Sequence, residues 1–161
     1  DHYGWKWWKH QQPDLEQAHL ELIDIFHFGL SARLVTGASV ESIAAEIEQD
    51  LTTPDSQPTF AESIEQMVAN TLKTKSFDVK TFAALMAQSE LSFDELFRHY
   101  VGKNVLNFFR QDHGYKTGEY IKIWHGKEDN EVLMDVLRAT DATATDFKDK
   151  VYQGLKSAYP V

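Results

Sequence analysis

The stretch Leu20–Leu30 reads LELIDIFHFGL, and seven of its eleven residues are Leu, Ile or Phe. Glu21 and Asp24 interrupt this apolar run three residues apart, a separation that places both carboxylates on one face of a helix. Such a helix is apolar nearly all round and is expected to be buried. Two carboxylates on a buried face are unfavourable unless a positive group pairs with them.

Helical signals continue on both sides of this run. A long helix is predicted at Pro13–Val35, with Gly37 just past its end. Ser92 and Glu95 form a capping box that opens a helix running to about residue 112. Further helices are predicted from the apolar spacing at Ser39–Leu51, Phe60–Leu72, Asp78–Ala87, Glu131–Ala139 and Thr145–Ala158.

Two stretches lack helical spacing. Thr52–Thr59 is a turn-rich linker, and Gly114–Asn130 is an irregular segment in which TGEYIKIW alternates weakly and predicts a short extended stretch. The predicted fold class is therefore all-α, with one domain over residues 1–161. Residues 38–90 are expected to form a mobile or inserted helical subdomain.

The amino-acid composition limits the metal ligands and the kinds of partner that this chain can have. The 161 residues are enough for one domain with a core, and they include no Cys, so any metal must be held by oxygen or imidazole. The net charge of −9 argues against a protein that binds the nucleic-acid backbone. No apolar segment has a membrane-spanning length and no signal peptide is visible, so we expect a soluble, cytoplasmic protein without a membrane partner.

The acidic pair has two interpretations. In the structural one, a Lys or Arg from another helix pairs with Glu21 and Asp24. In the functional one, the two carboxylates hold a hard divalent cation such as Mg²⁺, which takes oxygen ligands and often links protein carboxylates to substrate phosphates. The spacing alone leaves both open.

A basic face lies on the helix that contains YVGKNVLNFFRQDHGY, residues 100–115. Lys103, Asn107 and Arg110 fall at i, i+4 and i+7 and line one side. An ammonium, an amide and a guanidinium in line can clamp a phosphate. The alternative is a solvated face held by helix salt bridges. Lys122 and Asn130 follow in the glycine-containing loop.

The N-terminal WKWWKH, residues 5–10, also has two interpretations. It can be a hydrophobic anchor with snorkelling lysines. It can also form a flat wall for a base or sugar, with Lys6 reaching a phosphate. Together with the acidic pair and the basic face, it suggests a phosphate ester bridged by a metal.

The combination of WKWWK, ELIDIFHF and YVGKNVLNFFRQDHGYKTGEYIKIWHGKEDN resembles the dimeric all-α dUTPase family. That family belongs to the all-α nucleoside triphosphate pyrophosphatases, which include the MazG-like enzymes. The resemblance covers residues 1–31 and 100–130, and the helical middle carries no matching motif. It implies a multi-helix bundle, a homodimer, and Mg²⁺-dependent hydrolysis of dUTP, and of dUDP, to dUMP by water attack at the α-phosphorus.

The resemblance also implies roles for individual residues. Glu21 and Asp24 match the second metal-binding motif, ExxD. The positions that face the phosphates are matched by Lys103, Asn107, Arg110, Tyr115, Lys122 and Asn130. The positions near the base and deoxyribose are matched by Trp7, Trp8, His27 and Phe28.

The chain departs from the family pattern at its start. The first acidic motif, ExxE, should precede WKWWK, together with the glutamate that activates water and the residues that recognise uracil. Because the sequence begins at Asp1, we expect it to be part of a longer protein and to have weak or no activity by itself. Three rivals remain: the same fold acting on dCTP or a MazG-like substrate, a helical binding or dimerisation module with a structural acidic pair, and a nucleotide sensor that does not hydrolyse.

Overall fold

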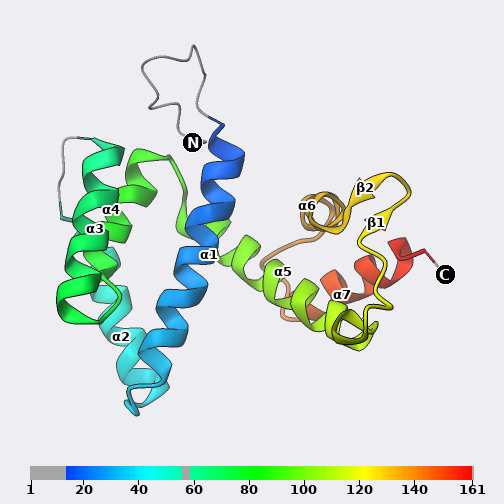
Figure 1. The fold of residues 1–161 in the computed structure, drawn as a ribbon, viewed down its shortest axis with the longest axis horizontal. Helices are drawn as coiled ribbons and strands as arrows, with labels where there is room; N and C mark the ends of the chain where they lie inside the picture. The colour runs from blue at the N-terminus through cyan, green and yellow to red at the C-terminus, as the bar shows by residue number, and fades with distance from the viewer. Residues whose placement is uncertain (1–13, 56–58, 161) are drawn as a thin grey trace. The chain divides into compact units, whose positions relative to one another are not determined.

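The computed structural model describes residues 14–55 and 59–160. Within them the chain forms seven α-helices and one two-stranded sheet, so the all-α prediction is confirmed (Figure 1). None of the described helices has an apolar stretch long enough to cross a membrane. The elements are α1 (Leu15–Leu34), α2 (Val40–Leu51), α3 (Phe60–Thr74), α4 (Val79–Gln88), α5 (Phe93–Asp112), a 3₁₀ turn (Tyr115–Thr117), β1 (Ile123–Trp124), β2 (Lys127–Glu128), α6 (Asp129–Ala139) and α7 (Phe147–Ala158).

The helix ends carry capping interactions, and the two end signals named from the sequence, the Ser92–Glu95 capping box and Gly37, are among them. Asp14 caps α1, because its carboxylate accepts a hydrogen bond from the backbone N–H of Gln17 at 3.1 Å. The capping box of α5 is confirmed, with Ser92 Oγ accepting from the Glu95 N–H at 3.2 Å and the Ser92 N–H donating to Glu95 Oε2 at 3.1 Å. Gly37 has a φ of 83°, as expected for the residue that ends a helix.

The chain divides into two compact units, a first unit up to Leu96 and a second unit from Phe97 onward. The first unit includes α1, which packs with α2 and whose Phe26 contacts Phe77 and Phe82, and the inserted or mobile subdomain at residues 38–90 stays a prediction. Whether residues 1–161 fold as a single domain stays a prediction.

The core of the first unit is aromatic where α1 meets the region around α4. The Phe26 ring stacks on Phe82 with centroids 5.4 Å apart and meets Phe77 edge-on at 6.1 Å. Gly29 makes this approach feasible, since a Cβ at that position would lie 2.5 Å from the Phe77 ring. The glycine thus fixes where α1 sits on its neighbours.

The core of the second unit joins α5, α6 and α7 to the hairpin. Trp124 of β1 is 1% exposed and its indole N–H donates to the carbonyl of Ile121 at 2.6 Å. The hairpin turn uses His125 and Gly126, whose φ values of 51° and 90° match a two-residue turn with two left-handed positions. The short extended stretch expected before residue 125 is therefore present as β1. The remaining buried core residues are Val105, Leu106, Phe109, Val132, Leu133, Leu137, Phe147, Val151 and Leu155.

Candidate functional site

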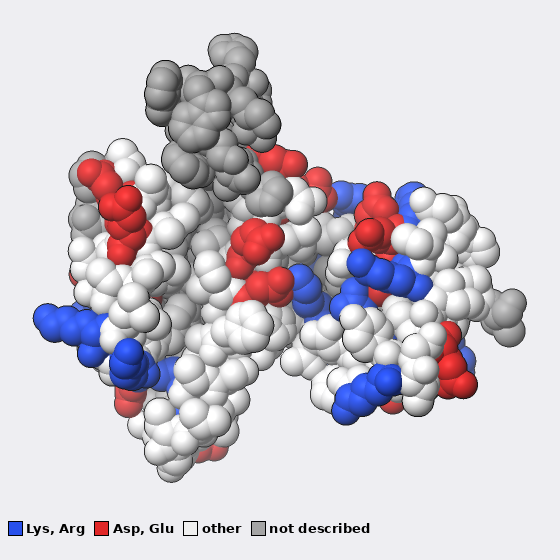
Figure 2. Space-filling model, in the orientation of Figure 1, with Lys and Arg blue, Asp and Glu red and all other residues white. Residues whose placement is uncertain are grey.

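The predicted metal-binding pair lies on the outer side of α1 in the first unit. Glu21 is exposed and Asp24 is half-buried, while Leu22 and Ile23 between them point into the core. Figure 2 shows acidic side chains at the surface over α1. The expectation of a helix buried on all sides is wrong, because the aromatic core covers one side and Phe28 is left 77% exposed.

The donor chemistry of this pair fits Mg²⁺. Glu21 and Asp24 supply carboxylate oxygens one helical turn apart, and Mg²⁺ is usually held by one or two carboxylates together with substrate phosphates and waters. Among residues 14–55 and 59–160, no three His, Asp or Glu side chains gather into a group that could hold a metal ion. The pair therefore offers part of a coordination sphere, and its assignment to Mg²⁺ stays a prediction.

The two described base- and sugar-site candidates follow on the same helix. His27 is half-buried, and its Nδ1 lies 3.1 Å from the carbonyl oxygen of Ile23 one turn earlier. Phe28 lines an open groove of about 400 Å³ between α1, α3 and the loop that leads to α4. The groove is mainly apolar, with Ile25, Gly29, Ala32, Met67, Val68, Thr71, Leu72, Lys75, Ser76 and Phe77 as its other lining residues. The candidates Lys6, Trp7 and Trp8 lie outside the described residues.

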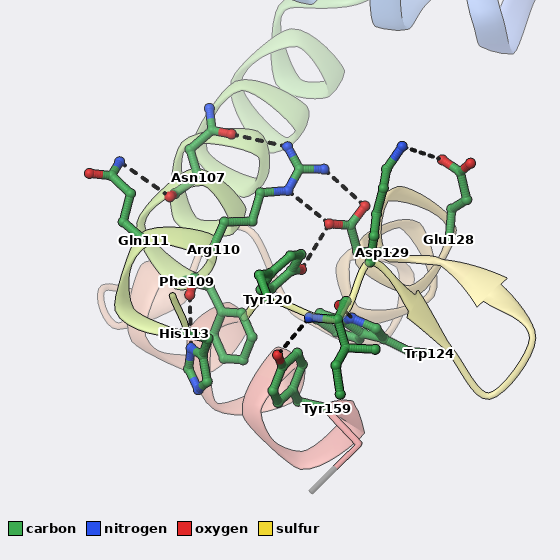
Figure 3. Close-up of polar contacts among 12 residues, drawn as sticks. Asn107, Phe109, Arg110, Gln111, His113, Tyr120, Trp124, Glu128, Asp129 and Tyr159 are labelled. Atoms are coloured by element: carbon green, nitrogen blue, oxygen red, sulfur yellow. Dashed lines mark hydrogen bonds and ion pairs between the residues drawn. The ribbon is translucent and has the colours of Figure 1, made fainter. Parts of the chain in front are cut away.

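In the second unit, Arg110 of α5 forms a two-point ion pair with Asp129 of α6 (Figure 3). Arg110 Nε lies 2.8 Å from Asp129 Oδ2, and Nη2 lies 2.9 Å from Oδ1. The hydroxyl of Tyr120 donates a third hydrogen bond to Oδ2 at 2.8 Å. The Asp129 side chain is fully buried and that of Arg110 is 16% exposed. A buried carboxylate is thus satisfied by three charge-assisted hydrogen bonds.

The environment fixes the charge states of this cluster. Burial alone would raise the pKa of Asp129, but the hydrogen bonds from Arg110 and Tyr120 and the guanidinium charge outweigh it, so the pKa lies below its ordinary value. Burial and the hydrogen bond to Asp129 raise the pKa of the Tyr120 hydroxyl. At neutral pH the cluster therefore holds an ionised Asp129, a charged Arg110 and a neutral Tyr120.

The segment before α6 brings these groups together. The backbone N–H of Asp129 donates to the carbonyl of Lys122 at 3.0 Å, which closes the loop across the hairpin. Tyr120 stacks on Tyr159, with ring centroids 5.6 Å apart, and the Tyr159 hydroxyl accepts from the Ile121 N–H at 3.0 Å. The end of α7 therefore holds the loop that carries Tyr120 toward Asp129.

The structure brings together three of the predicted phosphate-facing residues. Asn107 Oδ1 accepts from Arg110 Nη1 at 3.4 Å, and the guanidinium carbon lies 5.8 Å from the centre of the Tyr115 ring, a cation–π contact. Arg110 is not held by a helix salt bridge on a solvated face, since its carboxylate partner is buried and lies on another helix.

The other three described candidates are placed differently. Lys122 makes an exposed ion pair with Glu128, with Nζ 3.4 Å from Oε2. Lys103 is half-buried on α5, and Asn130 is half-buried in the first turn of α6. Figure 2 shows basic and acidic side chains close together on the surface of the second unit.

A family model described as dUTPase matches residues 1–115, which is more than half of the chain. The chain belongs to the dUTPase family. The expected resemblance is thereby confirmed, and a nucleotide is the kind of substrate that this family implies. A comparison with curated proteins found no match.

The match to the dUTPase family ends at Tyr115, so two partners of the Arg110 cluster, Tyr120 and Asp129, come from beyond it. Sequence reasoning named Arg110 but missed both. The ion pair joins residues 19 positions apart across a hairpin, and helical spacing carries no information about such a contact. An arginine on an apolar helix needs a carboxylate partner, and Asp129 at the start of the next helix could supply one. Sequence reasoning could have used this need as a signal.

Proposed function

We propose that this protein hydrolyses dUTP, and also dUDP, to dUMP by attack of water at the α-phosphorus. The observation that carries the proposal is the match of residues 1–115 to the dUTPase family. It is supported by an acidic pair on α1 and by a guanidinium cluster on α5 and α6, the two kinds of groups that phosphoryl chemistry requires.

The acidic pair has the role of cation ligand in this proposal. Glu21 and Asp24 would hold Mg²⁺, which when bound neutralises phosphate charge and stabilises the charge that develops in the transition state. Glu21 is exposed on α1, so its carboxylate is accessible to a cation, and Asp24 lies half-buried one turn further along the helix. No described residue is assigned as the base that activates the water.

The second unit supplies the phosphate-facing groups. A guanidinium has five N–H donors. Asp129 takes one from Nε and one from Nη2, and Asn107 takes one from Nη1, so Arg110 keeps two for a phosphate. We assign Lys103, Asn107, Tyr115, Lys122 and Asn130 to the phosphates as well.

The base and deoxyribose are assigned to the N-terminal part of the chain. The exposed Phe28 ring at the edge of the apolar groove offers a flat surface for stacking, and His27 lies beside it on α1. Trp7 and Trp8 are assigned the same role from the sequence.

The direct test measures pyrophosphate release by the full-length protein from dUTP, dCTP and dTTP, with Mg²⁺ and with excess chelator. The expected result is Mg²⁺-dependent turnover that prefers dUTP. Turnover that prefers dCTP would support the related nucleotide pyrophosphatase. Mg²⁺-dependent binding of a non-hydrolysable dUTP analogue without turnover would support a nucleotide sensor. If the protein neither binds the analogue nor hydrolyses a nucleotide, it is a structural helical module.

We also propose that the protein forms a homodimer. Ile64, Val68 and Leu72 lie at i, i+4 and i+8 on α3 and are exposed, and apolar surface of this kind is typical of association sites. Light scattering coupled to size exclusion should give twice the chain mass, and a concentration-independent monomer would contradict the proposal.

A further inference from the structure

The Arg110–Asp129 pair raises a question about charge. Asp129 is fully buried, and its negative charge offsets the positive charge of the residue that is assigned to the phosphates. A buried ion pair adds little net stability compared with apolar residues of the same size. The pair therefore contributes something other than attraction for an anion or simple stability.

The contacts around the Arg110 guanidinium indicate what the ion pair contributes. Asp129 binds the guanidinium at two points along one edge, Tyr115 lies against the group at 5.8 Å, and Asn107 accepts from Nη1. Figure 3 shows the ion pair and the Asn107 contact on the guanidinium. Contacts on several atoms of one planar group restrain both its plane and its rotation. A fixed planar group presents its remaining donors in one direction.

We propose that Asp129 is a positioning residue, which orients the Arg110 guanidinium so that its two remaining N–H donors, beside Asn107, take a phosphate of the nucleotide. Tyr120 assists by donating a hydrogen bond to Asp129 Oδ2, the oxygen that also accepts from Arg110 Nε. The inference rests on the proposed function for the identity of the anion. The orientation of the Arg110 guanidinium does not depend on the proposed function, and it can be measured without turnover of dUTP.

The first experiment measures orientation. In ¹⁵N–¹H spectra of the full-length protein, the Nε–H signal of Arg110, assigned with Arg110→Lys, should be sharp and protected from exchange with water. Asp129→Asn should broaden or abolish this signal. Asp135→Asn is the matched control, because Asp135 pairs with Lys127 at 2.7 Å in the same unit but is 48% exposed, and it should leave the signal unchanged.

The second experiment separates binding from turnover of dUTP. Asp129→Asn should lower kcat about tenfold or more, because a misplaced donor contributes less in the transition state. KM should change less than about threefold, since removing a negative charge from the site offsets the lost orientation. A merely structural role would lower the folded fraction, with kcat per folded molecule and KM unchanged, and this result would overturn the proposal.

Tyr120→Phe covers the case in which Asp129→Asn does not fold. It removes only the hydroxyl that donates to Asp129 and should lower kcat severalfold with little change in KM. A kcat per folded molecule equal to that of the wild type would count against the proposal.

The orientation and the proposed function can fail separately. Inorganic pyrophosphate should shift the Arg110 Nε–H signal of the wild type, and Asp129→Asn should weaken this response. If these effects occur but dUTP is not hydrolysed, the positioning role stands and the proposed function fails. If dUTP is hydrolysed but Asp129→Asn leaves the Arg110 signal intact, the positioning role is wrong.

Discussion

Asp129 in the second unit is fully buried and paired with the partly buried Arg110, whereas Glu21 in the first unit is exposed on α1 and Asp24 is half-buried. A fully buried carboxylate must be satisfied by the fold itself, because its desolvation is costly. A carboxylate such as Glu21 remains hydrated and needs no such partner. Folding itself thus completes the environment of Asp129, whereas the exposed Glu21 keeps its carboxylate in water, where a ligand can reach it.

This difference predicts opposite consequences of mutation. Loss of one member of the Arg110–Asp129 pair should strongly lower the free energy of unfolding. Charges on α1 should control catalysis, with little effect on stability where the side chain is exposed.

Arg110→Gln should have the largest effect. It leaves the Asp129 carboxylate buried without its cation, a loss of about 3–5 kcal/mol in the free energy of unfolding. Urea unfolding followed by circular dichroism measures this loss. A variant as stable as the wild type would contradict the expected difference between the Arg110–Asp129 pair and the carboxylates on α1.

Two variants serve as controls for that measurement. Arg110→Gln combined with Asp129→Asn removes both charges and should recover much of the lost stability, although not the activity. Asp135→Asn removes two exposed ion pairs, with Lys127 and with Arg138, and pairs of this kind contribute little, so the free energy of unfolding should change by about 1 kcal/mol or less.

Glu21→Gln in the full-length enzyme should have the reverse profile. We expect kcat for dUTP to fall about 100-fold or more, the size of effect seen when an electrostatic contact to a transition state is removed. The free energy of unfolding should change by about 0.5 kcal/mol or less, because the side chain is exposed. Asp24→Asn should lower kcat similarly, and unchanged turnover in both variants would exclude them as metal ligands.

Gly29→Ala tests the packing that positions the acidic pair. The new Cβ would lie 2.5 Å from the Phe77 ring, and overpacking of this kind costs about 1–3 kcal/mol, offset by about 1 kcal/mol of higher helix propensity. We therefore expect a net loss of up to about 2 kcal/mol in urea unfolding. Adding Phe77→Leu should recover part of it, and a variant more stable than the wild type would contradict the observed packing.

The pH dependence of stability should report Asp129. Its pKa in the folded state is lowered from an ordinary value of about 3.9. The stability from its ionisation is therefore fully present above the unfolded-state pKa and is lost as pH falls through the folded-state pKa. The double variant lacking Arg110 and Asp129 should lose less stability than the wild type as pH falls below about 4. Parallel curves would show that Asp129 does not contribute.

Local structure was predictable from the sequence because its signals are local. Ser92 and Gly37 act within a few residues of the helix ends that they define, and apolar spacing predicted the other five of the seven described helices. The shared side of Asn107 and Arg110 follows from the same spacing, and their contact confirms it.

The remaining features depend on contacts between distant segments. The exposure of Phe28 is set by which side of α1 the Phe77 and Phe82 rings cover. The burial of Asp129 requires the hairpin to bring α6 to Arg110, and the role of Tyr120 requires the stacking of Tyr159 from α7. Residue spacing and composition do not indicate which distant segments come into contact.

Hydrolysis of dUTP in ¹⁸O-labelled water by the full-length protein, with Mg²⁺ present, tests the proposed function most directly. Attack at the α-phosphorus predicts that the label appears in dUMP and not in pyrophosphate, and that Glu21→Gln abolishes most of the product. Label in pyrophosphate, or the absence of any labelled product from the wild type, would contradict the proposed hydrolysis.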